Sequence, residues 1–280
     1  MIAVFRHTYR RFQGQILGWS IGLGVYILLM ISLYPEIANV DFAAYYQQFP
    51  EALMGFFGDA MFAIATPAGY LQLYYFNYMP VIIGIFVVGA AAGLLAGDEE
   101  RGLLDLVLAQ PVSRAAFFWG RVLALAAAVA TILAVNWLCW WLPSKRFGLD
   151  LTALELLRPF LPLFAELMLV GMLSLALSLL LPSARAASAT AGGLLVANYL
   201  LTGLANTNED LKAAVAYTPL HFYQGGEAME ALKWGWVAGL LGAALLLALV
   251  AWWRLERRDI RVGGEGGWRL PILTRRKRAA

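Results

Sequence analysis

The residues best suited to specific chemistry lie between Gly97 and Arg114, where a short charged segment interrupts two long apolar runs. Three acids, Asp98, Glu99 and Glu100, open the segment. Acids suit a helix N-terminus, because its unpaired N–H groups and the helix dipole favour negative charge. Four apolar residues follow at helical spacing and predict one apolar face: Leu103, Leu104, Val107 and Leu108. We therefore predict an amphipathic helix over residues 98–114, placed against a membrane surface where a partner from the aqueous phase could dock.

This segment resembles a signature found between the second and third spans of type-2 ABC transporter permeases. Leu103 stands where threonine is usual, and the matching positions are Glu99, Glu100, Gly102, Asp105 as the acid, Pro111, Val112 and Arg114. The resemblance implies a coupling helix that contacts a separate ATPase or gates the cytoplasmic entrance, through Asp98, Glu99, Glu100, Arg101, Gly102, Asp105 and Arg114. A charged turn between two membrane helices would explain the same residues without a partner.

Composition limits the class of protein independently of that resemblance. The 280 residues are 61% hydrophobic and 14% charged, with a mean hydropathy of +0.68, which is too apolar for a soluble globular protein. The single cysteine, Cys139, excludes an intramolecular disulfide, and two distant histidines leave little for a zinc site. The sequence has no phosphate-binding P-loop and no recognisable catalytic motif. We therefore expect no enzyme activity and no cofactor in this chain, with ATP and Mg²⁺ bound by the partner.

Apolar runs long enough to cross a hydrocarbon core of ~30 Å predict an all-α polytopic membrane protein. Six such runs lie near residues 16–34, 78–97, 122–142, 160–181, 186–204 and 234–253. Residues 1–14 place basic and aromatic side chains on opposite faces, as in a helix lying in the membrane interface, and the resembled family has an elbow helix there. An ordinary basic flank that sets the topology is the alternative. We expect a transmembrane domain over 1–255 and a basic tail over 256–280.

Lysines and arginines predict the orientation, because they gather in cytoplasmic loops. With a cytoplasmic N-terminus, sixteen of the 21 lie on the cytoplasmic side and five outside. Both termini and the 98–114 helix are then cytoplasmic, and the resemblance implies a prokaryotic inner membrane. The basic tail suits anionic lipid, and no folded basic domain points to nucleic acid.

Two outer segments resemble the same permeases more weakly. Residues 66–71 have a Thr-Pro-x-Gly-Tyr phrase before the second span, and residues 217–223 form an aromatic Thr-Pro-Leu segment after the fifth. His221, within the latter, is a candidate for pH sensing or substrate contact, and an interfacial aromatic-like residue is the simpler interpretation.

Polar residues inside the spans are few and mark candidates for a substrate pathway. They are Asn136, Glu166 and Asn198. Glu166 lies about two turns inside the outer boundary and eight residues after Arg158, so hydration or pairing near the outer surface is the alternative to a pathway role.

Taken together, these features predict the permease subunit of a bacterial or archaeal ABC exporter. The resemblance implies two copies of a nucleotide-binding ATPase subunit and a second permease copy or a sister permease, with membrane lipid around them. An ion-coupled secondary transporter using Glu166 remains an alternative, as does a membrane anchor or signalling scaffold that transports nothing. The substrate is not indicated, although the scarcity of polar residues in the spans favours a hydrophobic one.

Overall fold

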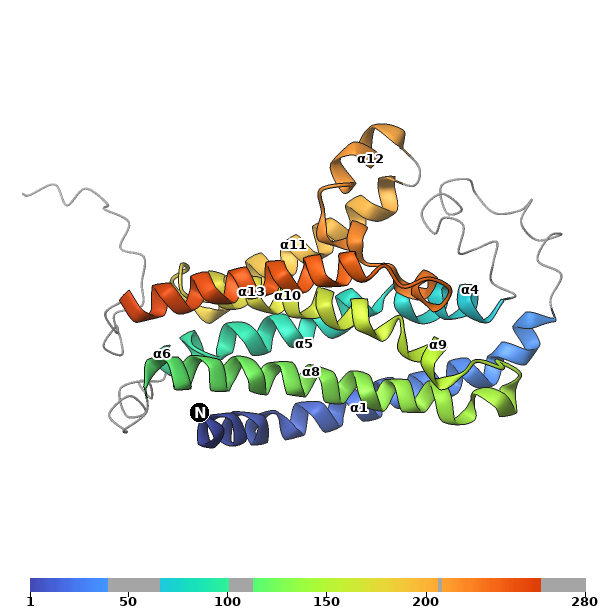
Figure 1. The fold of residues 1–280 in the computed structure, drawn as a ribbon, viewed down its shortest axis with the longest axis horizontal. Coiled ribbons are helices and arrows are strands. Elements are labelled where there is room, and N and C mark those ends of the chain that lie inside the picture. The colour runs from blue at the N-terminus through green and yellow to red at the C-terminus, as the bar shows by residue number, and fades with distance from the viewer. Residues whose placement is uncertain (40–65, 101–112, 206–207, 258–280) are drawn as a thin grey trace, which may run out of the picture.

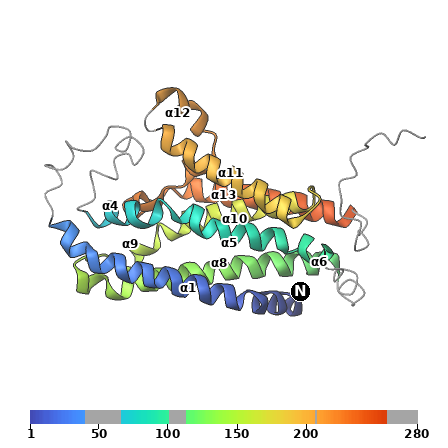
Figure 2. The same cartoon turned by 180° about the vertical axis from the view of Figure 1, so that it is seen from behind.

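The computed structural model describes residues 1–39, 66–100, 113–205 and 208–257, and the regular structure in these residues is entirely helical (Figure 1). Long helices lie side by side along the long axis of the molecule, as both views show (Figures 1 and 2). Within the described residues, six helical runs are long and apolar enough to cross a membrane: Ile2–Ala38, Pro67–Gly93, Arg114–Phe147, Ala153–Ser178, Ala184–Ala205 and Trp234–Arg257. The predicted all-helical fold with six spans is therefore confirmed.

Three of these runs are divided into named elements. The second comprises α4 (Pro67–Leu71), a π-helical turn η2 (Gln72–Phe76) and α5 (Met79–Gly93). The third comprises α8 (Arg114–Ser144) and the 3₁₀ turn η3 (Lys145–Phe147), and the fourth comprises α9 (Ala153–Leu157) and α10 (Phe160–Ser178). The remaining spans are α1 (Ile2–Ala38), α11 (Ala184–Ala205) and α13 (Trp234–Arg257). Shorter helices connect them: α6 (Ala96–Glu100), α12 (Glu209–Val215), η4 (Pro219–Phe222) and η5 (Gly225–Met229).

Hydroxyl side chains determine where several helices begin. Ser113 Oγ accepts a hydrogen bond from the Ala116 N–H at 3.2 Å and caps α8. Thr66 Oγ1 accepts one from the Gly69 N–H at 3.1 Å, with Pro67 as the first residue of α4. Such caps satisfy N–H groups that the first turn of a helix leaves without partners. The Thr-Pro-x-Gly-Tyr phrase thus acts locally as a helix start.

The N-terminal region differs from the expected elbow followed by a span. One helix, α1, runs unbroken from Ile2 to Ala38, and its first turns pack against α8. Tyr9 and Thr131 share a hydrogen bond of 2.9 Å between their hydroxyls. A Cβ at Gly120 would come within 3.1 Å of the Val4 Cβ, so the absent side chain allows the close approach. No proline interrupts α1 before Pro35, and its packing along α8 accompanies one continuous helix.

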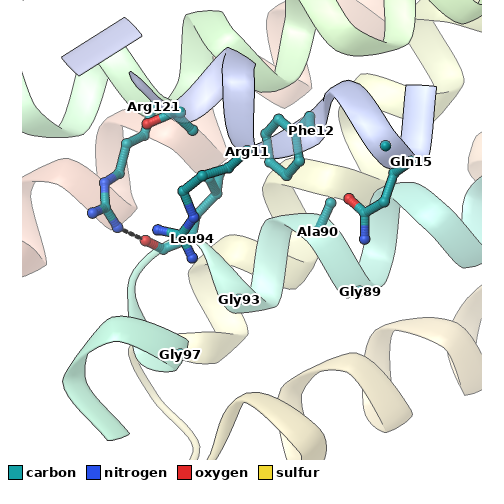
Figure 3. A pocket seen from close by; sticks show the side chains of 11 residues that line it. Arg11, Phe12, Gln15, Gly89, Ala90, Gly93, Leu94, Gly97 and Arg121 are labelled. Carbon is teal, nitrogen blue, oxygen red and sulfur yellow. Dashed lines mark hydrogen bonds between the residues drawn. The ribbon is translucent and has the colours of Figure 1, made fainter. Parts of the chain in front are cut away.

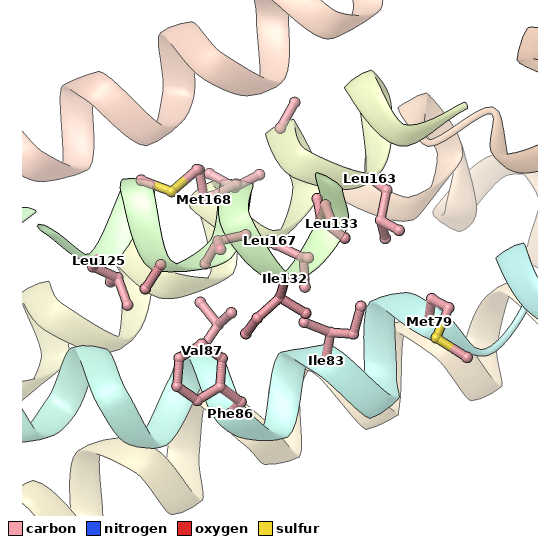
Figure 4. Close-up of a cluster of buried hydrophobic side chains, with 14 of the residues drawn as sticks. Met79, Ile83, Phe86, Val87, Leu125, Ile132, Leu133, Leu163, Leu167 and Met168 are labelled. Carbon is pink, nitrogen blue, oxygen red and sulfur yellow. The ribbon is translucent and has the colours of Figure 1, made fainter. Parts of the chain in front are cut away.

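The core is centred on α10. In its most apolar stretch 78% of the residues are buried, against 22% for α11 and 28% for α13. Figure 4 shows apolar side chains of α5, α8 and α10 meeting in the interior, Ile83, Ile132 and Leu167 among them. Helices α11 and α13 are consequently peripheral, with most of their surface turned outward.

Different helix ends meet at the two ends of the bundle. Met1, α6, the start of α8, the start of α11 and the end of α13 lie at one end, which we call the N-terminal end (Figure 1). The end of α1, together with α4, α9 and η5, lies at the opposite end. The predicted coupling segment therefore belongs to the N-terminal end.

Candidate functional site

The charged segment begins in α6 at the N-terminal end of the bundle. Asp98 and Glu99 lie within this helix, and Glu100 is its exposed last residue. Arg101, Gly102 and Asp105 lie outside the described residues, as does most of the amphipathic helix predicted over 98–114. Arg114 is the first residue of α8, after the cap at Ser113. The described residues thus hold the two ends of the predicted coupling segment, Asp98–Glu100 in α6 and Arg114 in α8.

Glu100 joins the segment to the fifth span. Its Oε1 accepts a hydrogen bond of 2.7 Å from the backbone N–H of Ala184, the first residue of α11. A carboxylate at this position satisfies one of the unpaired N–H groups and opposes the positive end of the helix dipole. The acid thus caps a helix that lies more than eighty residues away in the sequence.

Arg114 joins the other end of the segment to the sixth span. Its Nη1 donates hydrogen bonds to the backbone carbonyls of Leu255 at 3.4 Å and Glu256 at 3.1 Å, in the last turn of α13. A cation is favoured there because the C-terminal carbonyls carry partial negative charge. Glu100 therefore connects one end of the segment to the N-terminus of α11, and Arg114 connects the other end to the C-terminus of α13.

Asn136, one of the polar residues within the spans, joins the second span to the third span. It is fully buried in α8, and its Nδ2 donates a hydrogen bond of 3.0 Å to the Tyr75 hydroxyl in η2. Its Oδ1 has no hydrogen-bond partner among the described residues. The Tyr75 ring also packs edge-on against Trp140, with centroids 5.7 Å apart.

Glu166 lies inside the bundle on α10 and is fully buried. Within the part of the chain that the structure describes, neither of its carboxyl oxygens has a hydrogen-bond partner. Arg158, the partner considered from the sequence, instead donates a hydrogen bond of 2.9 Å from Nη1 to the Met229 carbonyl. Arg158 is therefore not the hydrogen-bond partner of Glu166 among the described residues, and hydration or pairing near the outer surface stays the alternative to a pathway role.

Asn198 occupies a different environment, half-buried on the peripheral helix α11. Its Oδ1 is buried and has no partner among the described residues. No hydrogen bond to a side-chain oxygen joins Asn136, Glu166 and Asn198 to one another in those residues. The three candidates thus supply separate unpaired oxygens and do not form one network.

The opposite end brings together the two outer segments that were noted in the sequence. The Tyr223 hydroxyl donates a hydrogen bond of 2.8 Å to the Phe76 carbonyl, and the Gly226 N–H donates one to Gln72 Oε1. A Cβ on Gly226 would lie 2.8 Å from the Gln72 Cβ, so only glycine permits this approach. His221 is exposed, and its ring lies 5.6 Å from that of Trp236. Two hydrogen bonds therefore hold this end of the second span against the segment that precedes α13, and we call the contact of Gln72 with Gly226 the latch.

Sequence reasoning missed three residues of these contacts: Gln72, Gly226 and Arg121. Arg121 was counted only as a cytoplasmic charge, yet it is 4% exposed and donates a hydrogen bond to the Leu94 carbonyl at the end of α5. Its place inside an apolar run was the available signal, because a charge within a span usually has a specific role. No comparable local signal identifies Gln72 or Gly226, since their contact joins segments distant in the chain.

Comparison with known proteins identifies one family. A family model described as "ABC-2 family transporter protein" matches residues 18–260, which include the five spans after α1 and most of α1 itself. A search of curated proteins found no match to the chain.

Proposed function

The chain belongs to the ABC-2 family of transporter proteins and is a multi-pass membrane protein, and from this premise we propose that it is the permease subunit of an ATP-driven exporter. A separate nucleotide-binding subunit, present in two copies, binds ATP and Mg²⁺. A second copy of this chain, or a sister permease, completes the membrane domain. Export is the direction that the resemblance of the Gly97–Arg114 segment implies.

The observation that carries this proposal is the pair of contacts at the ends of that segment. Glu100 caps the start of α11, and Arg114 binds the last carbonyls of α13. A displacement of the segment by the ATPase would therefore act on α11 and α13 as well as on its covalent neighbours α6 and α8. Rigid helices that are linked in this way can pass a local shift to a distant site. In this proposal Glu100 and Arg114 transmit the motion. The residues that face the ATPase or the gate are Asp98, Glu99, Arg101, Gly102 and Asp105.

We propose further that Asn136, Glu166 and Asn198 supply polar groups to the pathway. Burying a polar group without a hydrogen bond costs free energy, so unpaired oxygens inside the bundle call for a functional reason. Each of these residues has an oxygen that no described group satisfies, and a passing substrate or water could satisfy it. The pathway then opens at the cytoplasmic side of a prokaryotic inner membrane, given the predicted orientation.

Affinity purification tests the proposal. The tagged chain, extracted in mild detergent, should retain a P-loop subunit in stoichiometric amount, and the eluate should hydrolyse ATP. Reversing both Glu99 and Glu100 to lysine should remove that subunit and its ATPase activity. The same reversal at Glu227, an exposed acid at the opposite end, should leave both in place.

Two other outcomes would contradict the proposal in different ways. A chain that purifies alone in several detergents, without ATPase activity, would favour an ion-coupled transporter, for which Glu166 is the next residue to change. A partner that remains bound to the Glu99→Lys/Glu100→Lys variant would keep the ABC assignment but place the coupling contact elsewhere. Normal membrane insertion of that variant is the required control.

A further inference from the structure

The Glu166 carboxyl is enclosed near the start of α10. The residue is 0% exposed, and neither carboxyl oxygen has a hydrogen-bond partner in the described residues. We infer that this carboxyl is a cation-exchange site, which holds a proton in the absence of ligand and a lipophilic organic cation, such as a substituted ammonium or phosphonium ion, when ligand is bound. The inference rests on the pathway role proposed above for Glu166, but it does not depend on the ATPase.

The charged side chains around α10 do not neutralise this carboxyl. Arg158 donates instead to a carbonyl of η5, Glu155 caps α9, and Glu227 of η5 is exposed. Lys233 is exposed at the start of α13, with its Nζ 4.0 Å from the centre of the Trp236 ring. Helix α5, which packs against α10, has no charged residue. Helices α8, α11 and α13 carry their basic residues toward the N-terminal end of the bundle: Arg114, Arg121, Arg185, Arg254 and Arg257.

Two of those arginines show how far these cations lie from the carboxyl. Arg254 donates a hydrogen bond of 3.5 Å to the Leu179 carbonyl, thirteen residues or about 20 Å beyond Glu166 along α10. Arg121 donates to the Leu94 carbonyl and borders a cavity of about 420 Å³ between the start of α1 and the end of α5 (Figure 3). An ionised carboxylate buried without a partner costs too much free energy to persist. The site must therefore take one positive charge from outside the described residues, as a proton or as a ligand.

Aromatic rings near the carboxyl favour an organic cation as that ligand. Burial, and then the nearby Tyr75 hydroxyl and Glu166 carboxyl, raise the pKa of Tyr223 well above its ordinary value, so both groups lie close to Tyr223. The Tyr75 ring in turn packs against Trp140 and Phe160, with centroids 5.7 Å and 5.8 Å away. Aromatic rings attract organic cations, and the attraction is larger where water is excluded. A carboxylate beside such rings can therefore bind a cation that carries apolar substituents.

The oxygen ligands in this region are too few for a hard metal ion. Ca²⁺ takes six to eight oxygen ligands, and Mg²⁺ requires an octahedral set. Within the described ranges, no group of three or more His, Cys, Asp or Glu residues could hold a metal ion. Asn136 Oδ1, which has no partner there, adds a single neutral acceptor beside Tyr75. A large monovalent cation does not require a complete ligand shell, and it fits this site better.

Proton release on cation binding tests the exchange with the purified full-length chain. The protein, in uncharged detergent and weakly buffered solution at neutral pH, receives tetraphenylphosphonium, and a pH-indicator dye reports the protons released. Equilibrium dialysis measures the cation bound. The wild type should release about one proton for each cation bound, because the buried site holds a single positive charge. Triphenylphosphine oxide, which is uncharged, should release none.

Glu166→Gln should abolish both cation binding and proton release, because an amide is uncharged. Glu166→Asp keeps the acid and should retain the one-to-one exchange with weaker binding, which separates loss of the acid from loss of the fold. Glu227→Gln, at the exposed acid of η5, is the matched control and should leave both measurements unchanged.

Three results would overturn the inference. Cation binding without proton release would mean that Glu166 does not exchange a proton for the ligand. Equal binding and release in Glu166→Gln would place the exchange at another group. Absence of binding in the wild type would leave Glu166 as a neutral or hydrated acid without this ligand. None of these results would contradict the permease proposal, because co-purification of the ATPase tests that separately.

Discussion

At the scale of single residues, the hydrogen bond between Asn136 and Tyr75 is the clearest polar contact in the interior. It joins α8 to the π-helical turn of the second span at 3.0 Å. Hydrogen bonds between membrane helices contribute only modestly, since the separated groups also find partners in the membrane. This bond should therefore specify how the two spans align more than it stabilises the fold.

A double-mutant cycle measures this contribution. Tyr75→Phe, Asn136→Leu and the combined variant should give a coupling free energy of about 0.6 kcal/mol, the average for such bonds. The free energy of unfolding would be measured by reversible denaturation in mixed micelles. Strictly additive effects would contradict the contact. Asn136→Leu by itself is expected to destabilise little, because it also removes the buried, unsatisfied Oδ1.

Gly171 sets how closely α10 approaches α5. A Cβ added there would lie 2.7 Å from Val87 Cγ1, a branched side chain with little freedom to move. Gly171→Ala should therefore destabilise the protein by about 1–3 kcal/mol, the usual cost of overpacking a core. The loss would appear as a lower midpoint of thermal aggregation in detergent.

Gly193→Ala is the matched control for that substitution. Gly193 is also inside a span, α11, but a Cβ there meets no atom within 4 Å. Alanine at this position should leave stability unchanged or raise it slightly, because alanine has the higher helix propensity. A fall as large as that of Gly171→Ala would mean that glycine matters in these helices for reasons other than packing.

At the scale of elements, η5 packs closely against the second span at the opposite end. The Gln72 side chain leaves the π-helical turn to accept the Gly226 N–H. A π-helical turn is rare and is often found at functional sites. The turn is therefore a point where the second span could change its winding when η5 moves.

Gly226→Ala should separate these two elements, because its Cβ would lie 2.8 Å from the Gln72 Cβ and 3.0 Å from the Ala68 carbonyl. We expect faster hydrogen exchange of backbone amides in residues 67–76, measured by mass spectrometry. Gly235→Ala, where an added Cβ meets nothing within 4 Å, should leave that exchange unchanged. Unaltered exchange in the Gly226→Ala variant would show that the latch does not restrain the second span.

At the scale of the whole molecule, the peripheral spans leave broad apolar faces uncovered. Leu200 and Leu204 on α11 are 48% and 51% exposed, and Leu246 and Trp253 on α13 are 65% and 52% exposed. Apolar surface of this extent suits lipid or a second membrane subunit and not water. The predicted second permease copy therefore has surface available on α11 and α13, the helices that Glu100 and Arg114 contact.

The orientation of the molecule can be measured by labelling single cysteines. In a Cys139→Ala background, Tyr217→Cys lies between α12 and η4, where Tyr217 is 91% exposed, and Arg185→Cys lies at the exposed start of α11. The distribution of lysine and arginine predicts that the N-terminal end is cytoplasmic. A membrane-impermeant thiol reagent should then label Tyr217→Cys in intact cells and Arg185→Cys only after permeabilisation. The reverse pattern would invert the topology and exclude the proposed ATPase contact.

Local properties of the chain were sufficient to predict the number and type of the main elements. Long apolar runs form helices in a membrane, because a helix satisfies its own backbone hydrogen bonds where no water is present. The charged segment from Gly97 to Arg114 was equally visible, since charge between two spans is conspicuous. The family that its pattern suggested is the one whose model covers residues 18–260.

Contacts between distant segments required the folded structure. The sequence could not show that Glu100 caps α11, that Arg114 binds the end of α13, or that Arg158 turns to Met229 and leaves Glu166 enclosed. It also predicted a separate elbow helix where packing against α8 accompanies one continuous α1. Helical periodicity determines which face of a helix is apolar, but the partner of each polar side chain depends on how the helices pack. The cavity between the start of α1 and the end of α5 likewise depends on how the helices pack, because residues of several helices line it.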